Sequence, residues 1–179
     1  GRRNVHIVVV ESLLDPLNLA RADLPADPFD PRFRGWVAAS RSTSLAPSFG
    51  GASARAEFEL LCGLPSYGLV DLELNLIRAA SLPCLPRLLR DHGYLTLTDN
   101  PAPGTFFNYH RAYPAMGFTD IHSADDFDLS DKDGPWLSND SFLRQHLQFL
   151  AAARRAGRPL FTYAFTNAGH YPFEIDTSR

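Results

Sequence analysis

Long apolar runs and a large excess of one charge are both missing from this sequence. The longest apolar run, VHIVVV, is strand-sized and far shorter than the roughly 20 residues that a membrane-spanning helix needs. Seventeen Lys and Arg stand against 20 Asp and Glu, so the net charge of -3 predicts no nucleic-acid-binding surface. Repeats and low-complexity tracts are absent too. The chain of 179 residues is therefore expected to be a soluble globular protein with one domain.

Cysteine is scarce as well, because the sequence has only Cys62 and Cys84. Two cysteines are too few for a disulfide scaffold, and neither has a second Cys or His at the spacing of a zinc site. A single bridge in an oxidising compartment and two buried thiols both fit the sequence. The residues themselves leave these alternatives open.

Strand-like and helical patterns alternate along the chain. Residues 4–12, NVHIVVVES, form a continuous β-branched run, which predicts a parallel strand buried on both faces and ending near Glu11. Further elements are expected as a helix over 53–63, a helix then a strand within 82–100, a helix capped near Asn139 or Asp140, and a strand over 160–165. Three such units predict an α/β fold with a mostly parallel central sheet and helices on both faces.

Two parts of the chain depart from this alternation. Residues 15–33 carry four prolines, and their Asp-Pro steps favour an irregular surface excursion over a helix. The chain also starts at Gly1 rather than Met, and its last strand is followed by no closing helix. We therefore expect residues 1–179 to be one portion of a longer domain.

Polar side chains follow three of the expected strands, where the carboxyl ends of parallel strands meet at one edge of a sheet. These residues are Glu11, the pair Asp99 and Asn100, and His170 in the TNAGHYPF segment. A carboxylate at such a position is either a hard oxygen ligand for a divalent cation or a cap of the next segment. His170, close to Asn167, suits anion binding or proton transfer, and equally a surface position.

Ser53 precedes a helical pattern and follows the small residues Gly50, Gly51 and Ala52. As an N-cap it would accept a hydrogen bond from the first helical turn, and Glu57 would match the positive end of the helix dipole. As a functional residue it would face a phosphate or sulfate at the helix N-terminus, with the glycines giving the anion room. The sequence FGGAS is neither a P-loop nor a G-x-S-x-G turn.

An aromatic segment, GTFFNYHRAYPAMGF over residues 104–118, surrounds Asn108, His110 and Arg111. Aromatic loops of this kind cover a core edge, or line a sugar or headgroup site where an arginine can bind phosphate. The other histidines carry no functional pattern. His6 is expected in the core or on a sheet face, and the remainder on helix or loop surfaces: His92, His122 and His146.

Taken in order, these segments resemble the catalytic domain of the lipoteichoic acid synthase and phosphoglycerol transferase family, a sulfatase-like branch of the alkaline phosphatase superfamily. NVHIVVVES is similar to its first strand, which implies that Glu11 is a metal ligand. GGASARAEFELLCGLPS resembles the nucleophile segment, where Ser53 takes the place of the usual Thr. FTNAGHYPFEID resembles the segment whose histidine contacts the substrate phosphate, which implies that role for His170.

The aromatic segment is similar to the family's substrate loop, so the implied substrate-binding set is Asn100, Phe107, Asn108, His110, Arg111 and His170. The family often has Trp-Asn-Arg where this chain has Phe107, Asn108 and Tyr109, with Arg111 displaced. The family's Asp-His metal ligands have no counterpart before Arg179. This portion alone is therefore expected to be inactive.

The resemblance implies a divalent-metal-dependent phosphoglycerol transferase with a serine nucleophile, with Mn²⁺ or Mg²⁺ favoured and Zn²⁺ an alternative. Its donor would be a phospholipid headgroup and its acceptor a glycan or polyol, outside the cytoplasm, with a membrane anchor in a preceding segment. The alternatives are a sulfatase-like phosphodiester hydrolase, a phosphoethanolamine transferase and a non-catalytic headgroup- or glycan-binding relative. SARAE lacks the Cys- or Ser-x-Pro-x-Arg context of a true sulfatase nucleophile.

Overall fold

The structure is a computed structural model that describes residues 1–15, 17, 24–40, 44–46, 53–66 and 82–172. The chain divides into two compact units: Gly1–Ser12 together with Pro47–Arg179, and Leu13–Ala46. Each unit is described by itself. The glycines and Ala52 that precede Ser53 lie outside the described residues, as does the end of the FTNAGHYPFEID segment.

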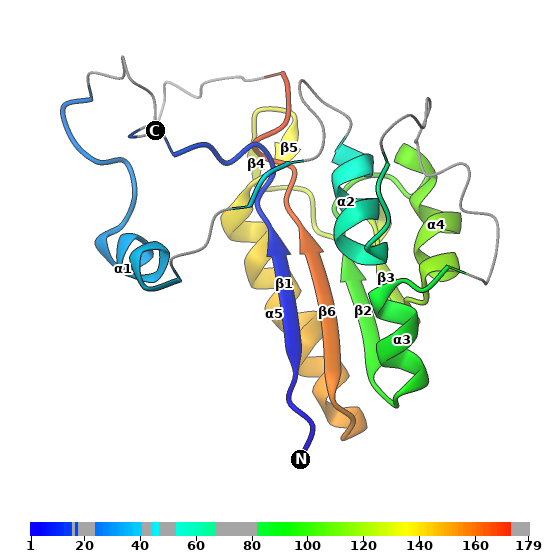
Figure 1. The fold of residues 1–179 in the computed structure, drawn as a ribbon. Helices are drawn as coiled ribbons and strands as arrows, with labels where there is room; N and C mark the ends of the chain where they lie inside the picture. Colours follow the sequence, from blue (N-terminus) through cyan, green and yellow to red (C-terminus); the bar gives the residue numbers. More distant parts are fainter. Residues whose placement is uncertain (16, 18–23, 41–43, 47–52, 67–81, 173–179) are drawn as a thin grey trace. The chain divides into compact units, whose positions relative to one another are not determined.

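The larger unit is built on a four-stranded sheet in the order β1-β6-β2-β3, and every neighbouring pair is parallel. The strands are β1 (Val5–Val9), β2 (Leu95–Asp99), β3 (Asp120–His122) and β6 (Leu160–Phe165). A short antiparallel hairpin joins β4 (Lys132–Asp133) to β5 (Trp136–Leu137). Because all four main strands run the same way, their carboxyl ends lie at one edge (Figure 1).

Helices cover both faces of this sheet (Figure 1), which confirms the predicted α/β class. On one face lie α2 (Ser53–Cys62), α3 (Leu85–Asp91) and α4 (Tyr109–Met116), and on the other lies α5 (Asn139–Ala153). Short 3₁₀ turns occupy Phe106–Asn108, Ala124–Asp126 and Arg154–Ala156. No helix in the described part of the chain is long and apolar enough to cross a membrane.

Strand β6 is buried along its whole length, because successive side chains enter two different cores. Phe161, Tyr163 and Phe165 pack into the larger core against α2, α3 and α4. Leu160 and Ala164 pack on the opposite face, against residues of α5. This two-sided burial explains the nearly continuous apolar run of β6.

Strand β1 is not buried on both faces, so that prediction was wrong. Val5, Ile7 and Val9 are partly buried against the larger core, whereas His6 and Val8 are exposed. The reason is that β1 pairs only with β6 and lies at the edge of the described sheet. An apolar run identifies a strand, but its place in the sheet depends on which strands pair with it.

The predicted helix ends agree closely with the structure. Gly63 follows α2 with a φ of 64° and Gly93 follows α3 with a φ of 88°, a conformation that favours glycine. Helix α5 begins at Asn139, and its N-cap is Ser138, whose hydroxyl accepts a hydrogen bond from the Ser141 amide. The prediction at Asn139 or Asp140 was thus one residue from the capping side chain.

The aromatic segment is a helix rather than a loop. Tyr109, Ala112, Tyr113 and Met116 are buried at helical spacing on α4, and the chain leaves the helix at Gly117, whose φ is 110°. The spacing of three and four residues is visible in the sequence, and the helix contains Pro114. The buried side chains confirm that the segment covers the core.

Cys62 at the end of α2 and Cys84 before α3 form a disulfide bond. The bridge spans 22 positions of the sequence, including residues outside the described part of the chain. The structure thus selects one of the two alternatives that the sequence left open.

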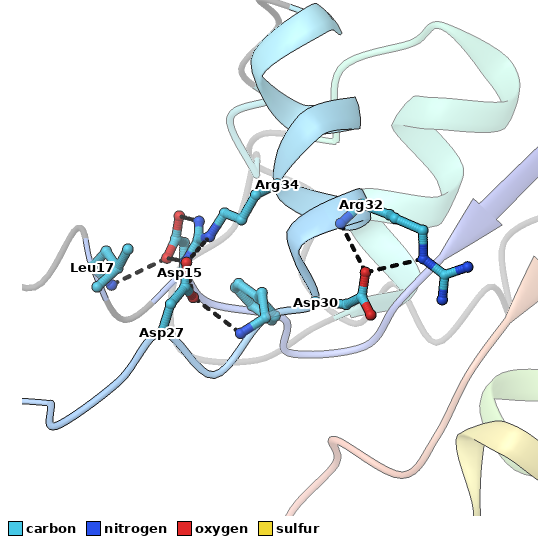
Figure 2. A network of polar contacts seen from close by, with 7 residues as sticks. Asp15, Leu17, Asp27, Asp30, Arg32 and Arg34 are labelled. Carbon is cyan, nitrogen blue, oxygen red and sulfur yellow. Dashed lines mark hydrogen bonds and ion pairs between the residues drawn. The ribbon is translucent and has the colours of Figure 1, made fainter.

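The smaller unit is organised by Arg34 on α1 (Pro31–Ser40) (Figure 2). The Arg34 guanidinium pairs with the carboxylates of Asp15 and Asp27, and these hydrogen bonds lower the pKa of both acids. Asp30 accepts a hydrogen bond from the Arg32 amide at 2.7 Å, which begins the helix. The helix therefore includes the end of the stretch 15–33 that was predicted to be irregular.

Candidate active site

Glu11 and Ser53 meet at the carboxyl edge of the sheet, although 42 positions separate them. The Ser53 hydroxyl, on the first residue of α2, donates to Glu11 Oε1 at 3.3 Å. Ser12 Oγ donates to the same oxygen at 3.0 Å, and the Glu11 amide donates to Thr166 Oγ1 at 3.1 Å, just after β6. These contacts orient the Glu11 carboxylate toward the start of α2.

The loop that carries His170 passes directly against Glu11. A Cβ atom on Gly169 would lie 2.2 Å from the Glu11 carbonyl oxygen, so this close approach requires a glycine. The His170 carbonyl accepts a hydrogen bond from Trp136 Nε1 at 2.9 Å, and the two rings lie edge to face at 5.1 Å. The hairpin residue Trp136 and Gly169 together fix the position of His170.

Five of the residues singled out in the sequence line one hollow at this edge, which has about 270 Å³ of space that includes open solvent. They are Glu11, Ser53, Asn100, Phe107 and His170. The hollow also has lining residues that the sequence did not assign to a site: Phe106, Tyr109, Trp136, Phe165 and Asn167. The hollow therefore lies where the carboxyl ends of β1, β2 and β6 meet the starts of α2 and α4.

The structure places the other predicted substrate residues outside this hollow. Asn108 precedes α4 in the left-handed conformation with a φ of 60°. His110 Nδ1 hydrogen-bonds the Gly104 carbonyl at 2.8 Å, and Arg111 is exposed on α4. Helix geometry is the cause, because consecutive residues at the start of α4 point in different directions.

Beneath the hollow, Glu57 lies buried one helical turn after Ser53. Tyr113 Oη donates to the Glu57 carboxyl at 3.2 Å, and Asn100 Nδ2 donates to the same hydroxyl at 3.2 Å. Burial raises the pKa of Glu57, and the hydrogen bonds with tyrosine lower it by less, so the pKa is about 8. Glu57 is therefore a neutral core residue at pH 7 and not a surface partner of the helix dipole.

Replacing Glu57 with Gln is expected to reduce the pH dependence of stability. Between pH 4.5 and about 8 the folded protein holds a proton that the unfolded chain releases. The free energy of unfolding therefore falls as pH rises, by up to about 1.4 kcal/mol per pH unit for this group. Urea unfolding of the full-length protein at pH 5 and pH 8 should show a larger loss for wild type than for Glu57→Gln. Equal losses would contradict the prediction.

Asp99 has neither of the roles that its strand-end position suggested. Its carboxylate is fully buried and accepts hydrogen bonds from His122 Nδ1, at 2.6 Å, and from His146 Nδ1. The expectation that these histidines lie on helix or loop surfaces was wrong, since His146 is 4% exposed and His122 is a half-buried residue of β3. Helix α5 packs across the sheet at Asp99, and that packing buries His146.

The possible metal ligands near Ser53, among the residues that the structure describes, are oxygen atoms that suit a hard divalent cation. The Glu11 carboxylate and the Ser53 hydroxyl offer oxygen atoms that converge within 3.3 Å. No group of three or more His, Cys, Asp or Glu that could hold a metal occurs among the residues that the structure describes. Glu11 and Ser53 are thus two candidate ligands of a larger set.

Comparison with known proteins identifies the family. The family model described as Sulfatase matches residues 3–178. The chain belongs to the sulfatase family. This sulfatase-family chain is 30% identical over 180 residues to a Rhizobium meliloti (strain 1021) protein named for the modification of cyclic β-1,2-glucan. The match covers 98% of the chain and 27% of that relative.

A second relative from the same organism is the capsular polysaccharide biosynthesis protein RkpI, which is 35% identical over 94 residues. That match covers 50% of this sulfatase-family chain and 18% of RkpI. The matches therefore span only 27% and 18% of the length of these two relatives.

Solved structures show the same fold. The lipoteichoic acid synthase LtaP from Listeria monocytogenes superposes with a TM-score of 0.82 at 21% identity, over 98% of this chain and 43% of LtaP. The phosphoglycerol transferase GacH from Streptococcus pyogenes, solved with sn-glycerol-1-phosphate, gives a TM-score of 0.70 at 20% identity, over 98% and 47%. The resemblance found in the sequence is thereby confirmed for the family and the fold of this sulfatase-family chain.

Proposed function

We propose that this chain carries part of the active site of a metal-dependent phosphoglycerol transferase that modifies an envelope glycan. The proposal depends on one observation above all, the 3.3 Å contact between Ser53 Oγ and Glu11 Oε1 in a hollow at the carboxyl edge of the sheet. A hydroxyl beside a carboxylate in an aromatic-walled space suits a nucleophile that attacks a phosphodiester. The structural likeness to LtaP and GacH supports the same choice.

In the proposed reaction Ser53 Oγ forms a bond to the phosphorus of the donor headgroup. The bond from phosphorus to the lipid oxygen breaks, and the lipid alcohol takes up a proton in place of the one that Ser53 loses. An acceptor hydroxyl then attacks the phosphorus, and Ser53 is restored as the leaving group. Glu11 and Ser53 would hold a divalent cation, with Mn²⁺ or Mg²⁺ favoured and Zn²⁺ an alternative, which supplies positive charge beside the reacting oxygens.

The other residues of the hollow have roles that follow from their chemistry. His170 and Asn100 offer ring and amide groups for the non-bridging phosphate oxygens and the glycerol hydroxyls. Phe106, Phe107 and Trp136 supply apolar walls that exclude water from the phosphoryl group. Asn108, His110 and Arg111 lie outside this hollow, so their substrate role stays a prediction that requires a ligand reaching beyond it.

The acceptor and the compartment are part of the same proposal. The relatives named for cyclic β-1,2-glucan modification and capsular polysaccharide biosynthesis favour a glycan acceptor. The Cys62–Cys84 disulfide favours an oxidising compartment outside the cytoplasm. A phospholipid donor would place the full-length enzyme at a membrane, where we propose that a segment preceding this chain anchors it.

Incubating the full-length protein with phosphatidylglycerol vesicles, cyclic β-1,2-glucan and Mn²⁺ tests the proposal. We expect diacylglycerol release together with phosphoglycerol on the glucan, both detected by mass spectrometry. Diacylglycerol release with free glycerol phosphate alone would indicate a hydrolase, and transfer from phosphatidylethanolamine instead would indicate a phosphoethanolamine transferase. Glucan binding without cleavage of any donor would indicate a non-catalytic relative.

A further inference from the structure

The cluster of Asp99, His122 and His146 has no part in the proposed reaction, yet it is unusual inside a protein. Asp99 is completely buried at the end of β2, where an unpaired carboxylate would cost several kcal/mol. It is compensated by two histidines that arrive from different elements, His122 from β3 and His146 from α5. The two histidines differ in position, because His122 lines a second hollow and His146 is not among the residues that line it.

The hydrogen bonds determine which ring atom of His122 is left for a ligand. A carboxylate can only accept, so Nδ1 donates to Asp99 and Nε2 is the ring atom left for a ligand, as an acceptor in the neutral ring and as a donor in the protonated ring. Nε2 lies 3.6 Å from Asp120 Oδ1, which is an ion-pair distance when the ring is protonated but is longer than a hydrogen bond. The ring is held in place by stacking on Phe149, with centroids 3.8 Å apart.

The hollow that His122 lines lies beside the Ser53 hollow, since Asn100 and Tyr109 line both, and it has about 300 Å³ of space that includes open solvent. Its remaining polar side chains include His110 and Ser123. His110 Nδ1 donates to the Gly104 carbonyl, which leaves its Nε2 as a second acceptor or donor. Several hydrogen-bonding groups on aromatic walls are the usual composition of a site for a hydroxyl-rich ligand.

The negative charges around this second hollow disfavour an anionic ligand. Burial lowers the pKa of His122, but the hydrogen bond and charge of Asp99, together with the charges of Asp120 and Asp126, raise it overall. These three carboxylates surround one histidine and would repel a phosphate or carboxylate ligand. A neutral ligand with hydroxyl groups is not repelled, and its hydroxyls can accept a hydrogen bond from a protonated ring or donate one to a neutral ring.

We infer that the hollow lined by His122, His110 and Ser123 binds a neutral sugar or polyol, and that Nε2 of the Asp99-held His122 hydrogen-bonds one of its hydroxyl groups. This inference rests on the proposed function, because it assigns the hollow to the acceptor. The shared walls at Asn100 and Tyr109 place the acceptor next to the donor hollow. His122 is then a binding residue for the acceptor, and Asp99 positions it.

The test measures binding rather than turnover, so that it stays separate from the proposed reaction. A linear β-1,2-linked glucose oligosaccharide is titrated by calorimetry into the full-length protein, which carries Ser53→Ala in every sample to prevent reaction. His122→Asn places an amide near the position of Nδ1, so Asp99 keeps a donor while Nε2 is lost. We expect its Kd for the oligosaccharide to rise about tenfold or more, the effect of losing one well-formed hydrogen bond.

Two further variants separate binding from folding. His146→Asn makes the same change on the other side of Asp99, away from the hollow, and should leave the Kd within about twofold. Gly104→Val keeps all three cluster residues but adds bulk, because a Cβ atom there lies 3.4 Å from His110 Cβ and 3.9 Å from Ser123 Oγ. We expect it to weaken binding as His122→Asn does.

Three results would overturn the inference. They are no binding of the oligosaccharide to the parent protein, an unchanged Kd in His122→Asn, or an equal loss in His146→Asn. A fourth such result would come from titration with inorganic phosphate. If the parent protein binds phosphate and only His122→Asn weakens that binding, the hollow is an anion site. Failure of phosphatidylglycerol cleavage by the wild type would count against the proposed function and leave this binding result unaffected.

Discussion

Full-length protein with Ser53→Ala loses headgroup transfer, with an expected fall in kcat of at least roughly 10³-fold. Alanine has no oxygen to bond to phosphorus, and the other hydroxyl on Glu11, that of Ser12, is not among the residues that line the hollow. The covalent phosphoglycerol adduct on the peptide containing Ser53 should disappear together with turnover. Mass spectrometry of the acid-quenched protein after mixing with phosphatidylglycerol measures the adduct.

Ser53→Thr is the matched control, because it keeps a hydroxyl at the same position and should retain measurable transfer. Alanine is a good helix former at the start of α2, so Ser53→Ala should unfold at nearly the wild-type temperature. If the alanine variant still forms the adduct or still transfers phosphoglycerol, Ser53 is not the nucleophile.

Glu11→Gln has the second largest expected effect, a loss of bound divalent metal and of roughly 10²-fold or more in kcat/KM. The amide keeps the shape of the side chain and can still meet the Ser53 and Ser12 hydroxyls, but it has lost the negative charge that attracts a cation. Elemental analysis of the purified full-length protein measures the metal directly. Activity should recover partly when Mn²⁺ is supplied in large excess.

Asp125→Asn is the control for this experiment, because it removes one exposed carboxylate away from the hollow. It should leave metal content and turnover at the wild-type level. Full metal occupancy and full turnover in Glu11→Gln would exclude Glu11 as a ligand.

Local signals were enough to predict most of the larger unit. Helix α2 and strand β6 occur where the sequence predicted them, because capping residues, glycines and apolar runs act over a few neighbouring positions. The edge position of β1 was not predictable, because it depends on pairing with β6. These two strands are far apart in the sequence, as the separation of 155 residues between Glu11 and Thr166 at their ends shows. Helix α4 was missed because its aromatic segment was interpreted as a loop, although the helical spacing is visible in the sequence.

The candidate site also contains residues that the sequence could predict and residues that it could not. Its strand-end residues could be named from sequence because every parallel strand ends at the same edge, which places Glu11, Asn100 and His170 near one another. The role of Asp99 could not be named, because its two partners lie 23 and 47 positions away and carried no local pattern. Trp136 was missed for the same reason, since only the hairpin brings it to His170.

The sequence by itself determined the α/β class, the family resemblance and the placement of Glu11, Ser53 and His170 at segment ends. Those properties follow from short-range patterns that a chain carries in its linear order. Only the tertiary structure decided that Glu57 is buried and neutral, that Asp99 holds two histidines, and that a second hollow adjoins the first. These depend on desolvation and on contacts between distant segments, which exist only after the helices have packed on the sheet.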